Sequence, residues 1–316
     1  MKRIPFIAVS LLLILLSACS QGEKQIQIGY VQITQDEVLN TAKQGVFAAL
    51  KDAGYVEDKN IKIIDNNAQG DLSMIVTIIQ SLQSQGVDLI ITNSTPCMVS
   101  AAQLVTNIPV VFTVAFGPEQ VGMKSTPPNL YGIYDPLDAK GFVSMMIECL
   151  PKLKKIGLPF NNAEPNAEYS AKVFSKELEQ RGISVVRATV NSPNDLTMVG
   201  RYLADQNIDA MIAAADNTVY MGLNALARVA DESRVPLFVT DPHQAKKGAA
   251  IGMGVNYQRW GYLSGQKAAE ILKGQAVLKK IEPITETELL VNNAACKAQG
   301  LTVPQSLLDK ATVFEQ

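Results

Sequence analysis

Two hydroxyl side chains, Ser94 and Thr95, stand directly after an apolar stretch and directly before Pro96. Proline is favoured in the first turn of a helix, so the spacing predicts a strand end, a short turn and a helix start. The free backbone N–H groups of a helix N-terminus attract anions, and the hydroxyls add further donors. The loop is therefore suited to receive a carboxylate, with an ordinary N-cap as the equal alternative.

Acidic side chains stand in two later loops that also follow apolar stretches. Asp216 lies in the loop 215–218, and Glu164 lies in the loop 160–166. A carboxylate in such a loop can accept an ammonium group through charge-assisted hydrogen bonds. If these loops face Ser94 across a cleft, one side supplies donors and the other supplies acids. That polarity predicts a small zwitterion such as an amino acid, with its ammonium group at Asp216 or Glu164. Aromatic residues near strand ends that could wall a side-chain pocket, or belong to the ordinary core, are Phe116, Phe160, Tyr220 and Tyr257.

The residues that most catalytic and metal sites require are scarce in this chain. The single histidine is His243, so the chain has almost no residues from which to form a histidine-dependent triad or a multi-histidine metal site. No glycine-rich dinucleotide fingerprint follows the first apolar stretch, and no Walker A sequence occurs. We therefore expect no catalytic residue, no metal and no cofactor. A hydrolase whose Ser or Asp residues come from distant loops stays an open alternative that no motif favours.

The N-terminus has the pattern of an export signal. Lys2 and Arg3 precede the apolar run 4–16, and Leu16-Ser17-Ala18-Cys19 then matches a lipobox. The run is shorter than the roughly 20 residues of a membrane-spanning helix. The pattern predicts a signal peptide over 1–18 and a lipid on Cys19. An ordinary signal peptide, or a membrane anchor with a chance cysteine, is the alternative.

The composition is that of a compact protein without a polyanionic partner. Apolar residues make up 47% of the chain, charged residues make up 18%, and the net charge is −2. This balance lacks the basic excess of a nucleic-acid-binding protein. Beyond the lipobox the cysteines are Cys97, Cys149 and Cys296, which are odd in number and lack metal-ligand spacing. Buried thiols are favoured over a disulfide between two of them.

Apolar stretches alternate with amphipathic ones, as in a parallel sheet covered by helices on both faces. The expected strands are Ile26–Ile33, Ile61–Asn66, Leu89–Thr92, Val110–Val114, Lys155–Phe160 and Glu288–Val291, and the expected helices include Val46–Ala53 and Met74–Gln83.

The series then starts again at an offset of about 120 to 127 residues. Asp71-Leu72-Ser73-Met74 is echoed by Asp195-Leu196-Thr197-Met198, and Ile108-Pro109-Val110 by Val235-Pro236-Leu237. The repeat predicts two similar α/β lobes, each doubly wound. Asp71 and Asp195 are expected to cap helices. Asp88 and Asp209, each just before an apolar strand, are expected to be turn residues at strand entry.

At these loops the chain resembles the ABC-transporter substrate-binding family that includes tryptophan- and tyrosine-binding lipoproteins. The likeness covers nearly all of the mature chain. The segments that carry it, in order, are Gly29-Tyr30-Val31-Gln32, Leu50-Lys51-Asp52-Ala53-Gly54-Tyr55, Asn67-Ala68-Gln69-Gly70-Asp71, Thr95-Pro96, Ile108-Pro109-Val110-Val111-Phe112, Asp216-Asn217-Thr218, Lys247-Gly248-Ala249 and Ala269-Glu270-Ile271-Leu272-Lys273-Gly274. Glu164-Pro165-Asn166 is similar to the Glu-x-Asn-Ser loop of the family, although Ala167 replaces the serine. Gly117-Pro118 stands where the family commonly has Asp-Pro, and Gln35-Asp36 where it often has Glu-His. These departures leave the ligand within the family open.

The resemblance implies the fold of type I periplasmic binding proteins, two doubly wound parallel-sheet lobes joined by a three-segment hinge. The expected segments are the tether 19–25, lobe 1 at 26–135 and 257–284, lobe 2 at 136–256 and 285–316, and hinges near 134–137, 256 and 283–285. The residues expected to contact the ligand are Gln32, Gln35, Ser94, Thr95, Phe116, Gly117, Asn162, Glu164, Asn166, Asp216, Asn217, Thr218, Asp241 and Asn256.

The function that the resemblance implies is extracytoplasmic capture of a small ligand by a lipid-anchored monomer, with amino acids, including aromatic ones, as the expected ligand class. Its expected partners are an ABC permease and the ATPase subunit of that permease, with membrane contact through the lipid alone and no nucleic acid. A ligand-sensing lipoprotein of the same fold, which feeds a signalling partner, is the alternative. A cytoplasmic sugar-repressor relative would need an N-terminal helix-turn-helix, where this chain has the lipobox.

Overall fold

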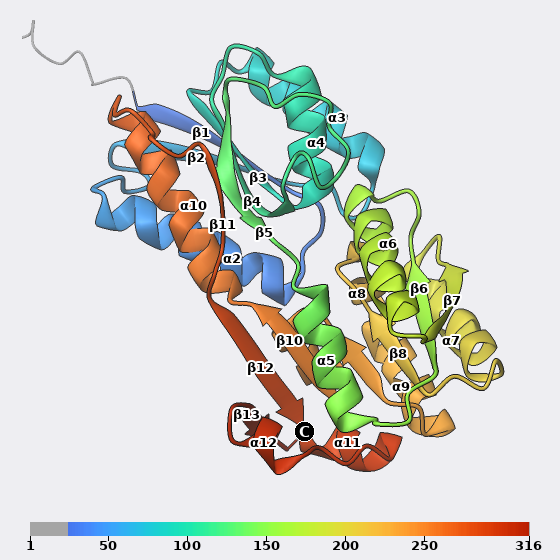
Figure 1. Cartoon of the computed structure of the whole chain (residues 1–316). Helices are drawn as coiled ribbons and strands as arrows, with labels where there is room; N and C mark the ends of the chain where they lie inside the picture. The colour runs from blue at the N-terminus through green and yellow to red at the C-terminus, as the bar shows by residue number, and fades with distance from the viewer. Residues whose placement is uncertain (1–24, 316) are drawn as a thin grey trace, which may run out of the picture.

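A computed structural model describes residues 25–315, and the predicted export signal and Cys19 lie outside them. These residues form two lobes, each built around a mostly parallel sheet (Figure 1). The two-lobed α/β fold predicted from the sequence is confirmed. Among the described residues, no helix is long and apolar enough to cross a membrane.

Lobe 1 holds a six-stranded sheet in the order β11-β5-β4-β3-β1-β2, in which every neighbouring pair is parallel. Its strands are β1 (Ile26–Gln32), β2 (Ile61–Asn67), β3 (Leu89–Asn93), β4 (Val110–Phe116), β5 (Leu130–Asp135) and β11 (Ile281–Pro283). Its helices are α2 (Glu37–Asp52), α3 (Leu72–Ser84), α4 (Thr95–Leu104) and α10 (Tyr257–Leu272).

Lobe 2 holds a seven-stranded sheet in the order β13-β12-β10-β9-β8-β6-β7, in which β12 runs antiparallel to β10. Its strands are β6 (Lys155–Phe160), β7 (Ser184–Thr189), β8 (Ala210–Ala213), β9 (Leu237–Val239), β10 (Ile251–Val255), β12 (Thr287–Asn292) and β13 (Thr312–Phe314). Its helices are α5 (Ala139–Cys149), α6 (Pro165–Gln180), η1 (Pro193–Asp195), α7 (Leu196–Ala204), α8 (Asn217–Met221), α9 (Leu223–Ser233), η2 (Pro242–Lys247), α11 (Asn293–Gln299) and α12 (Gln305–Leu308).

The repeat seen in the sequence corresponds to the same order of strands in the two sheets. In both lobes the first five strands along the chain lie in the spatial order second, first, third, fourth, fifth. This is one of the two common orders of doubly wound sheets. Asp88 and Asp209 fasten equivalent points of the two copies, because Asp88 accepts from Gln27 N at 2.8 Å and Asp209 accepts from Lys155 N at 2.9 Å. Both hydrogen bonds attach the turn before the third strand to the start of the first strand.

The predicted helix caps are partly right. Asp71 accepts from Ser73 N at 2.8 Å and caps α3 as expected. Asp195 does not cap α7 with its side chain, which instead accepts from the backbone N–H groups of Asn191 and Ser192 in the turn before η1. Helix α2 begins at Glu37, well before the expected Val46, because the Asp36 side chain caps its first turn.

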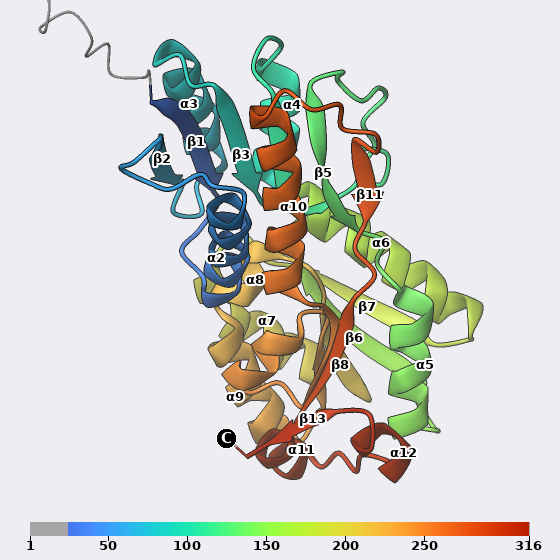
Figure 2. The same ribbon diagram turned by 90° about the vertical axis from the view of Figure 1, so that its left-hand side faces the viewer.

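The chain passes between the two sheets at three places: after β5, after β10 and after β11. Figure 2 shows the last of these, where the segment from β11 to β12 runs from lobe 1 down the length of lobe 2. Asn256, at the second crossing, caps α10 through Arg259 N at 2.6 Å and donates to Glu288 on β12. Two of the crossings are therefore tied to each other.

Helices α2 and α10 lie side by side with their backbones in contact (Figures 1 and 2). A Cβ atom on Gly261 would lie 1.8 Å from the Ala42 carbonyl oxygen, and one on Gly45 would lie 2.2 Å from that of Gln258. Only glycine allows this approach. The pair therefore forms one unit, and the first turn of each helix is held in a fixed position relative to the other.

The thiols of Cys97, Cys149 and Cys296 are free and buried, as favoured from the sequence. Burial raises the pKa of Cys97 and of Cys149 to about 12. Because the thiolate is the reactive form, these side chains act as packing residues.

Candidate ligand-binding site

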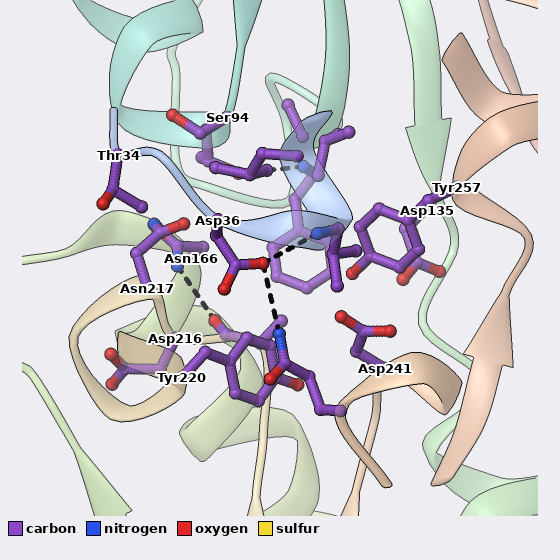
Figure 3. Close-up of a pocket in the computed structure, with 18 of the residues that line it drawn as sticks. Thr34, Asp36, Ser94, Asp135, Asn166, Asp216, Asn217, Tyr220, Asp241 and Tyr257 are labelled. Atoms are coloured by element: carbon purple, nitrogen blue, oxygen red, sulfur yellow. Dashed lines mark hydrogen bonds between the residues drawn. The ribbon is translucent and has the colours of Figure 1, made fainter. Parts of the chain in front are cut away.

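A cavity lies between the two lobes, where the carboxyl ends of both sheets converge (Figure 3). The space not filled by atoms there is about 580 Å³, which includes the solvent at its opening. The residues that line it are Thr34, Asp36, Val38, Leu39, Ser94, Thr95, Val114, Ala115, Phe116, Asp135, Asn166, Ala215, Asp216, Asn217, Tyr220, Met221, Asp241, Gln244, Tyr257 and Trp260.

Four carboxylates line this cavity. Asp36 and Asp135 come from lobe 1, and Asp216 and Asp241 come from lobe 2. The described residues of the lining include no lysine, arginine or histidine. The sequence had predicted donors on one lobe and acids on the other, and that polarity is wrong. The acids come from both lobes because the segments that follow the first and fifth strands of lobe 1 also carry aspartates.

Asp216 is buried, and both of its oxygens serve the local backbone. Oδ1 accepts from Val219 N at 3.0 Å and caps α8, while Oδ2 accepts from Asn161 N at 2.6 Å. Burial, with a further contribution from the Glu164 charge, raises the pKa of Asp216 well above its ordinary value. Figure 3 shows its carboxylate turned away from those of Asp36 and Asp241.

Glu164 lies beside the cavity and not in its lining. Its carboxylate accepts from Thr218 N at 3.0 Å, from Thr218 Oγ1 at 2.7 Å and from Asn217 N at 3.2 Å. It also accepts from Asn166 Nδ2 at 3.1 Å. Glu164 thus joins the start of α6 to the start of α8, and the predicted Glu164, Asn166 and Asp216 loops meet through it.

Asp135 and Asp241 are less fully paired. Oδ1 of Asp241 accepts from His243 N at 3.0 Å, but its buried Oδ2 accepts nothing from residues 25–315. Burial raises the pKa of Asp241 to about 7, and the nearby Asp36 charge contributes to the increase. Asp135 accepts from Leu137 N at 2.7 Å, and burial raises its pKa to about 6.

Three neutral residues of the lining also have buried polar atoms without a partner in the described chain: Ser94 Oγ, Asn166 Oδ1 and Gln244 Oε1. Ser94 has a φ of 124°, a strained backbone value for a residue other than glycine. Thr95 Oγ1 already has a partner within the protein, because it accepts a hydrogen bond from Phe116 N at 3.1 Å. Buried polar groups are normally hydrogen-bonded, so unpaired ones around a cavity indicate a ligand.

Aromatic rings form the remaining walls. Trp260 donates through Nε1 to the Ile133 carbonyl oxygen at 2.7 Å and lies against Tyr257, with 5.5 Å between ring centroids. Tyr220 exchanges a hydrogen bond of 2.9 Å with Thr240. These contacts hold the rings at fixed angles. The expected wall residue Phe160 is not in the lining and instead packs against the Arg187 guanidinium, 4.2 Å from its ring centroid.

Half of the predicted contact residues line the cavity, namely Ser94, Thr95, Phe116, Asn166, Asp216, Asn217 and Asp241. The other half do not, namely Gln32, Gln35, Gly117, Asn162, Glu164, Thr218 and Asn256. Gln32 illustrates why, since its side chain donates to Thr34 O at 2.6 Å and Asn40 Oδ1 at 3.0 Å and supports the loop behind the lining. Gln35 and Asn162 are exposed on the outer side of their loops.

Sequence reasoning missed Asp135, Gln244 and Trp260 as lining residues. Asp135 ends the fifth strand of lobe 1, and the carboxyl end of a strand is a signal that could have found it. Within residues 25–315 no three His, Cys, Asp or Glu side chains are grouped to hold a metal ion.

The lobes also touch each other around the cavity. Lys247 of lobe 2 pairs with Asp36 of lobe 1 at 2.6 Å, and Gln120 Nε2 of lobe 1 donates to the Tyr169 hydroxyl of lobe 2 at 2.9 Å. Phe116 and Tyr169 meet edge to face, with 4.9 Å between ring centroids. These contacts describe a closed arrangement of the two lobes.

Comparison with known proteins decides the family. Residues 27–314 match the family described as ABC transporter substrate binding protein, which covers nearly the whole described chain. The chain belongs to this family. The resemblance drawn from the sequence motifs is therefore confirmed, and the cavity lies outside the carboxyl ends of the strands, where doubly wound sheets generally bind ligands.

Two relatives give the extent of the likeness. The binding protein is 28% identical over 284 residues to a tyrosine-binding protein of Clostridioides difficile, an alignment that covers 88% of this chain and 82% of the relative. It is 26% identical to a conserved domain protein from Vibrio cholerae, whose crystal structure it matches with a TM-score of 0.88 over 93% of this chain and 100% of that one.

A third relative differs in shape. The ligand-free, open structure of a substrate-binding protein with adhesive properties from Clostridium difficile is 26% identical and covers 92% of this chain and 99% of its own, but its TM-score is 0.68. Sequence identity is the same as for the Vibrio protein, and this relative is described as open, whereas an ion pair and a hydrogen bond join the two lobes of the present binding protein.

Proposed function

We propose that the protein is an extracytoplasmic receptor of an ABC importer, anchored by a lipid on Cys19, that closes on a small amino-acid-like ligand and delivers it to a permease. The observation that carries the proposal is the set of unpaired buried polar atoms around a cavity shared by both lobes, above all Asp241 Oδ2 and Ser94 Oγ. Binding and release suffice for this role, and we assign no catalytic residue.

The lining suggests how an amino acid would be oriented. Its ammonium group would meet Asp241, whose free oxygen lacks a donor. Its carboxylate would meet the first-turn N–H groups at the start of α4, beside Ser94. The relative described as a tyrosine-binding protein supports an amino acid as the class of ligand.

Closure follows from contacts on both lobes. Ser94 belongs to lobe 1 and Asp241 to lobe 2, so one ligand can bind both only when the cavity is closed. The ligand then stabilises the closed state by the difference between its affinities for the closed and open forms. A permease that recognises the closed shape would receive only loaded receptors.

Calorimetry on ligand-free mature protein with separate sets of amino acids, sugars, nucleosides and short peptides tests the proposal. We expect binding by amino acids, and we expect Ser94→Ala to weaken it by about fivefold to tenfold, because a neutral hydrogen bond contributes about 1 kcal/mol. Ser73→Ala, on the exposed start of α3, is the control. If a sugar or nucleoside binds and no amino acid does, the ligand class is wrong while the receptor role stands.

The anchor is tested separately. Cys19→Ser removes the thiol that would carry the lipid, and we expect the protein to move from the detergent phase to the aqueous phase in detergent partitioning. The lipid supplies the membrane affinity in this proposal, since each buried methylene contributes about 0.8 kcal/mol. Unchanged partitioning of the Cys19→Ser protein would contradict the anchor.

The pair between Asp36 and Lys247 should favour the closed state. Lys247→Met keeps the length of the side chain and removes its charge, so we expect the lobes to open and ligand affinity to fall by about fivefold, as for loss of about 1 kcal/mol. Small-angle scattering on the ligand-free protein should show a larger radius of gyration. Lys246→Met, at the exposed neighbouring position, is the matched control. Equal radii of gyration for the two variants would argue against a role of the Asp36–Lys247 ion pair in closure.

A further inference from the structure

We propose that the ligand of this cavity carries a net positive charge, with one cationic group held between Asp135 and Asp241 beside Tyr257 and Trp260. This inference rests on the proposed receptor function and narrows its ligand from amino-acid-like molecules in general to cationic ones. Three independent features of the lining carry it: the balance of charge, the demand for hydrogen-bond donors and the aromatic walls.

The charge balance leaves two carboxylates outside any ion pair among the described residues, although Lys247, which is paired with Asp36, still lowers the pKa of one of them, Asp241. Asp36 is paired with Lys247 at 2.6 Å. Asp216 is held by two backbone N–H groups and caps α8, where the helix dipole favours an anion. Asp135 and Asp241 each accept one backbone N–H, and no cationic side chain of the described lining reaches them.

These two carboxylates come from opposite lobes, and both lie close enough to Tyr257 to raise the pKa of its hydroxyl. Figure 3 shows Asp241 pointing from the lobe 2 side toward Asp135 and the hydroxyl end of Tyr257. Burial already raises the pKa of Asp241 to about 7 and that of Asp135 to about 6. A neutral zwitterion would add its own carboxylate to this site and leave the total charge unchanged. A ligand with an additional cationic group neutralises the excess and repays the cost of burying the two acids.

The unpaired atoms that lobe 2 contributes to the cavity lining all require donors. Asn166 Nδ2 donates to Glu164 at 3.1 Å and to Ala215 O at 2.9 Å, so its unpaired Oδ1 must be the atom that faces the cavity. Gln244 Nε2 lies 3.4 Å from Asp36 Oδ1, which likewise orients the unpaired Oε1. With Asp241 Oδ2 these are three acceptors, and ammonium and guanidinium groups are the side-chain groups that carry donors without acceptors.

The aromatic walls suit the same group. Tyr257 and Trp260 lie together at the start of α10, and Tyr220 and Phe116 also line the cavity. A cation within about 6 Å of such a ring is attracted to its face, and the attraction is strongest when the cation is desolvated. Carboxylates with aromatic faces beside them therefore form a subsite for a buried cation.

Matched ligand pairs test the inference. Ligand-free protein would be titrated calorimetrically with L-arginine against L-citrulline, L-lysine against L-norleucine, and tyramine against L-tyrosine. Each pair keeps its general shape and changes its charge by one. We expect the tightest ligand to be a cationic member, bound at least tenfold more tightly than its neutral counterpart. Equal or tighter binding of the neutral members would overturn the inference. Because those neutral members are amino acids, the proposed function would survive that result. Binding by sugars or nucleosides alone would contradict both the inference and the proposed ligand class.

Two variants locate the subsite. Asp135→Asn and Asp241→Asn keep the shape of the side chains and remove one charge each, so we expect the preference for the cationic member to fall toward equality. Asp58→Asn is the control, because Asp58 is exposed in lobe 1 with a φ of 61° that asparagine also tolerates. Thermal unfolding of every variant checks folding. A cation preference that persists in both cavity variants would refute the assignment to Asp135 and Asp241.

Discussion

Replacing Asp241 with Asn is expected to make the ligand-free protein more stable at pH 8 and to abolish most of its affinity for a cationic ligand. The Asp241 carboxyl has a pKa raised to about 7, because burial outweighs the opposing effects of the His243 N–H group and the Lys247 charge. Each unit of pKa corresponds to about 1.4 kcal/mol, and the pKa rises by about 3 units from its ordinary value of 3.8, so the ionised side chain destabilises the folded protein by about 4 kcal/mol. Asparagine fills the same space without that cost.

The sign of the pH dependence follows from the raised pKa. Between the unfolded pKa near 4 and the folded pKa of about 7, the unfolded chain loses the proton while the folded chain keeps it. This group therefore lowers stability progressively as the pH rises through that window, and its full cost is present above it. The charged side chains near Asp241 are Asp36, which raises its pKa, and Lys247, which lowers it.

Urea unfolding of the wild-type protein and of Asp241→Asn between pH 4.5 and 8 measures this difference. The stability advantage of the variant should grow with pH and level off above about pH 7. Asp58→Asn should follow the wild-type curve throughout. A variant that is no more stable than the wild-type protein at pH 8 would show that Asp241 already has a counter-charge. At binding sites, a substitution that raises the stability of the folded protein commonly lowers its affinity for the ligand.

The second large effect is expected from Gly261→Ala. The added Cβ would lie 1.8 Å from the Ala42 carbonyl oxygen and 2.6 Å from its carbon, and backbone atoms cannot move aside as a flexible side chain can. Helices α2 and α10 would have to separate. Overpacking costs about 1 to 3 kcal/mol in ordinary cores, and we expect a loss at or above the upper end of that range.

The matched control is Gln266→Ala, on the exposed face of the same helix, which should change stability by less than about 0.5 kcal/mol. Ligand affinity of any folded Gly261→Ala protein should also fall, because α2 begins after Asp36 and α10 begins with Tyr257, two lining residues. Wild-type stability in Gly261→Ala would mean that the two helices are not in backbone contact in solution.

The sequence predicted the strands well because buried parallel strands are short, continuous apolar runs. Strand β6 was predicted at its observed bounds, Lys155–Phe160. The start of α2 was missed because polar residues in its first turns hide the buried Val38, Leu39 and Ala42. Burial of that face depends on α10, which lies more than two hundred residues further along the chain.

The site was harder to predict because its residues come from crossings between lobes. Ser94 and Asp216 stand in loops that follow strands, and position alone identified them. Trp260 lies one turn inside a helix that follows the second crossing, and nothing in its local sequence indicates a cavity. Glu164 was predicted to contact the ligand because it is an acid in a suitable loop, but its carboxylate accepts hydrogen bonds from Thr218 at the start of α8. Loop position shows which residues can meet, but their hydrogen bonds decide which remain free.

Trp260 is the only tryptophan in the chain, and its indole lies in the cavity lining. The protein therefore carries one indole fluorophore, placed where the ligand would bind, with its N–H fixed on the Ile133 carbonyl oxygen. When the indole is excited selectively over the nine tyrosines, its emission reports on this one environment, without background from other indoles. Occupancy of the cavity can thus be followed optically in unlabelled protein, and the same residue makes the chain a ready scaffold for a reagentless sensor.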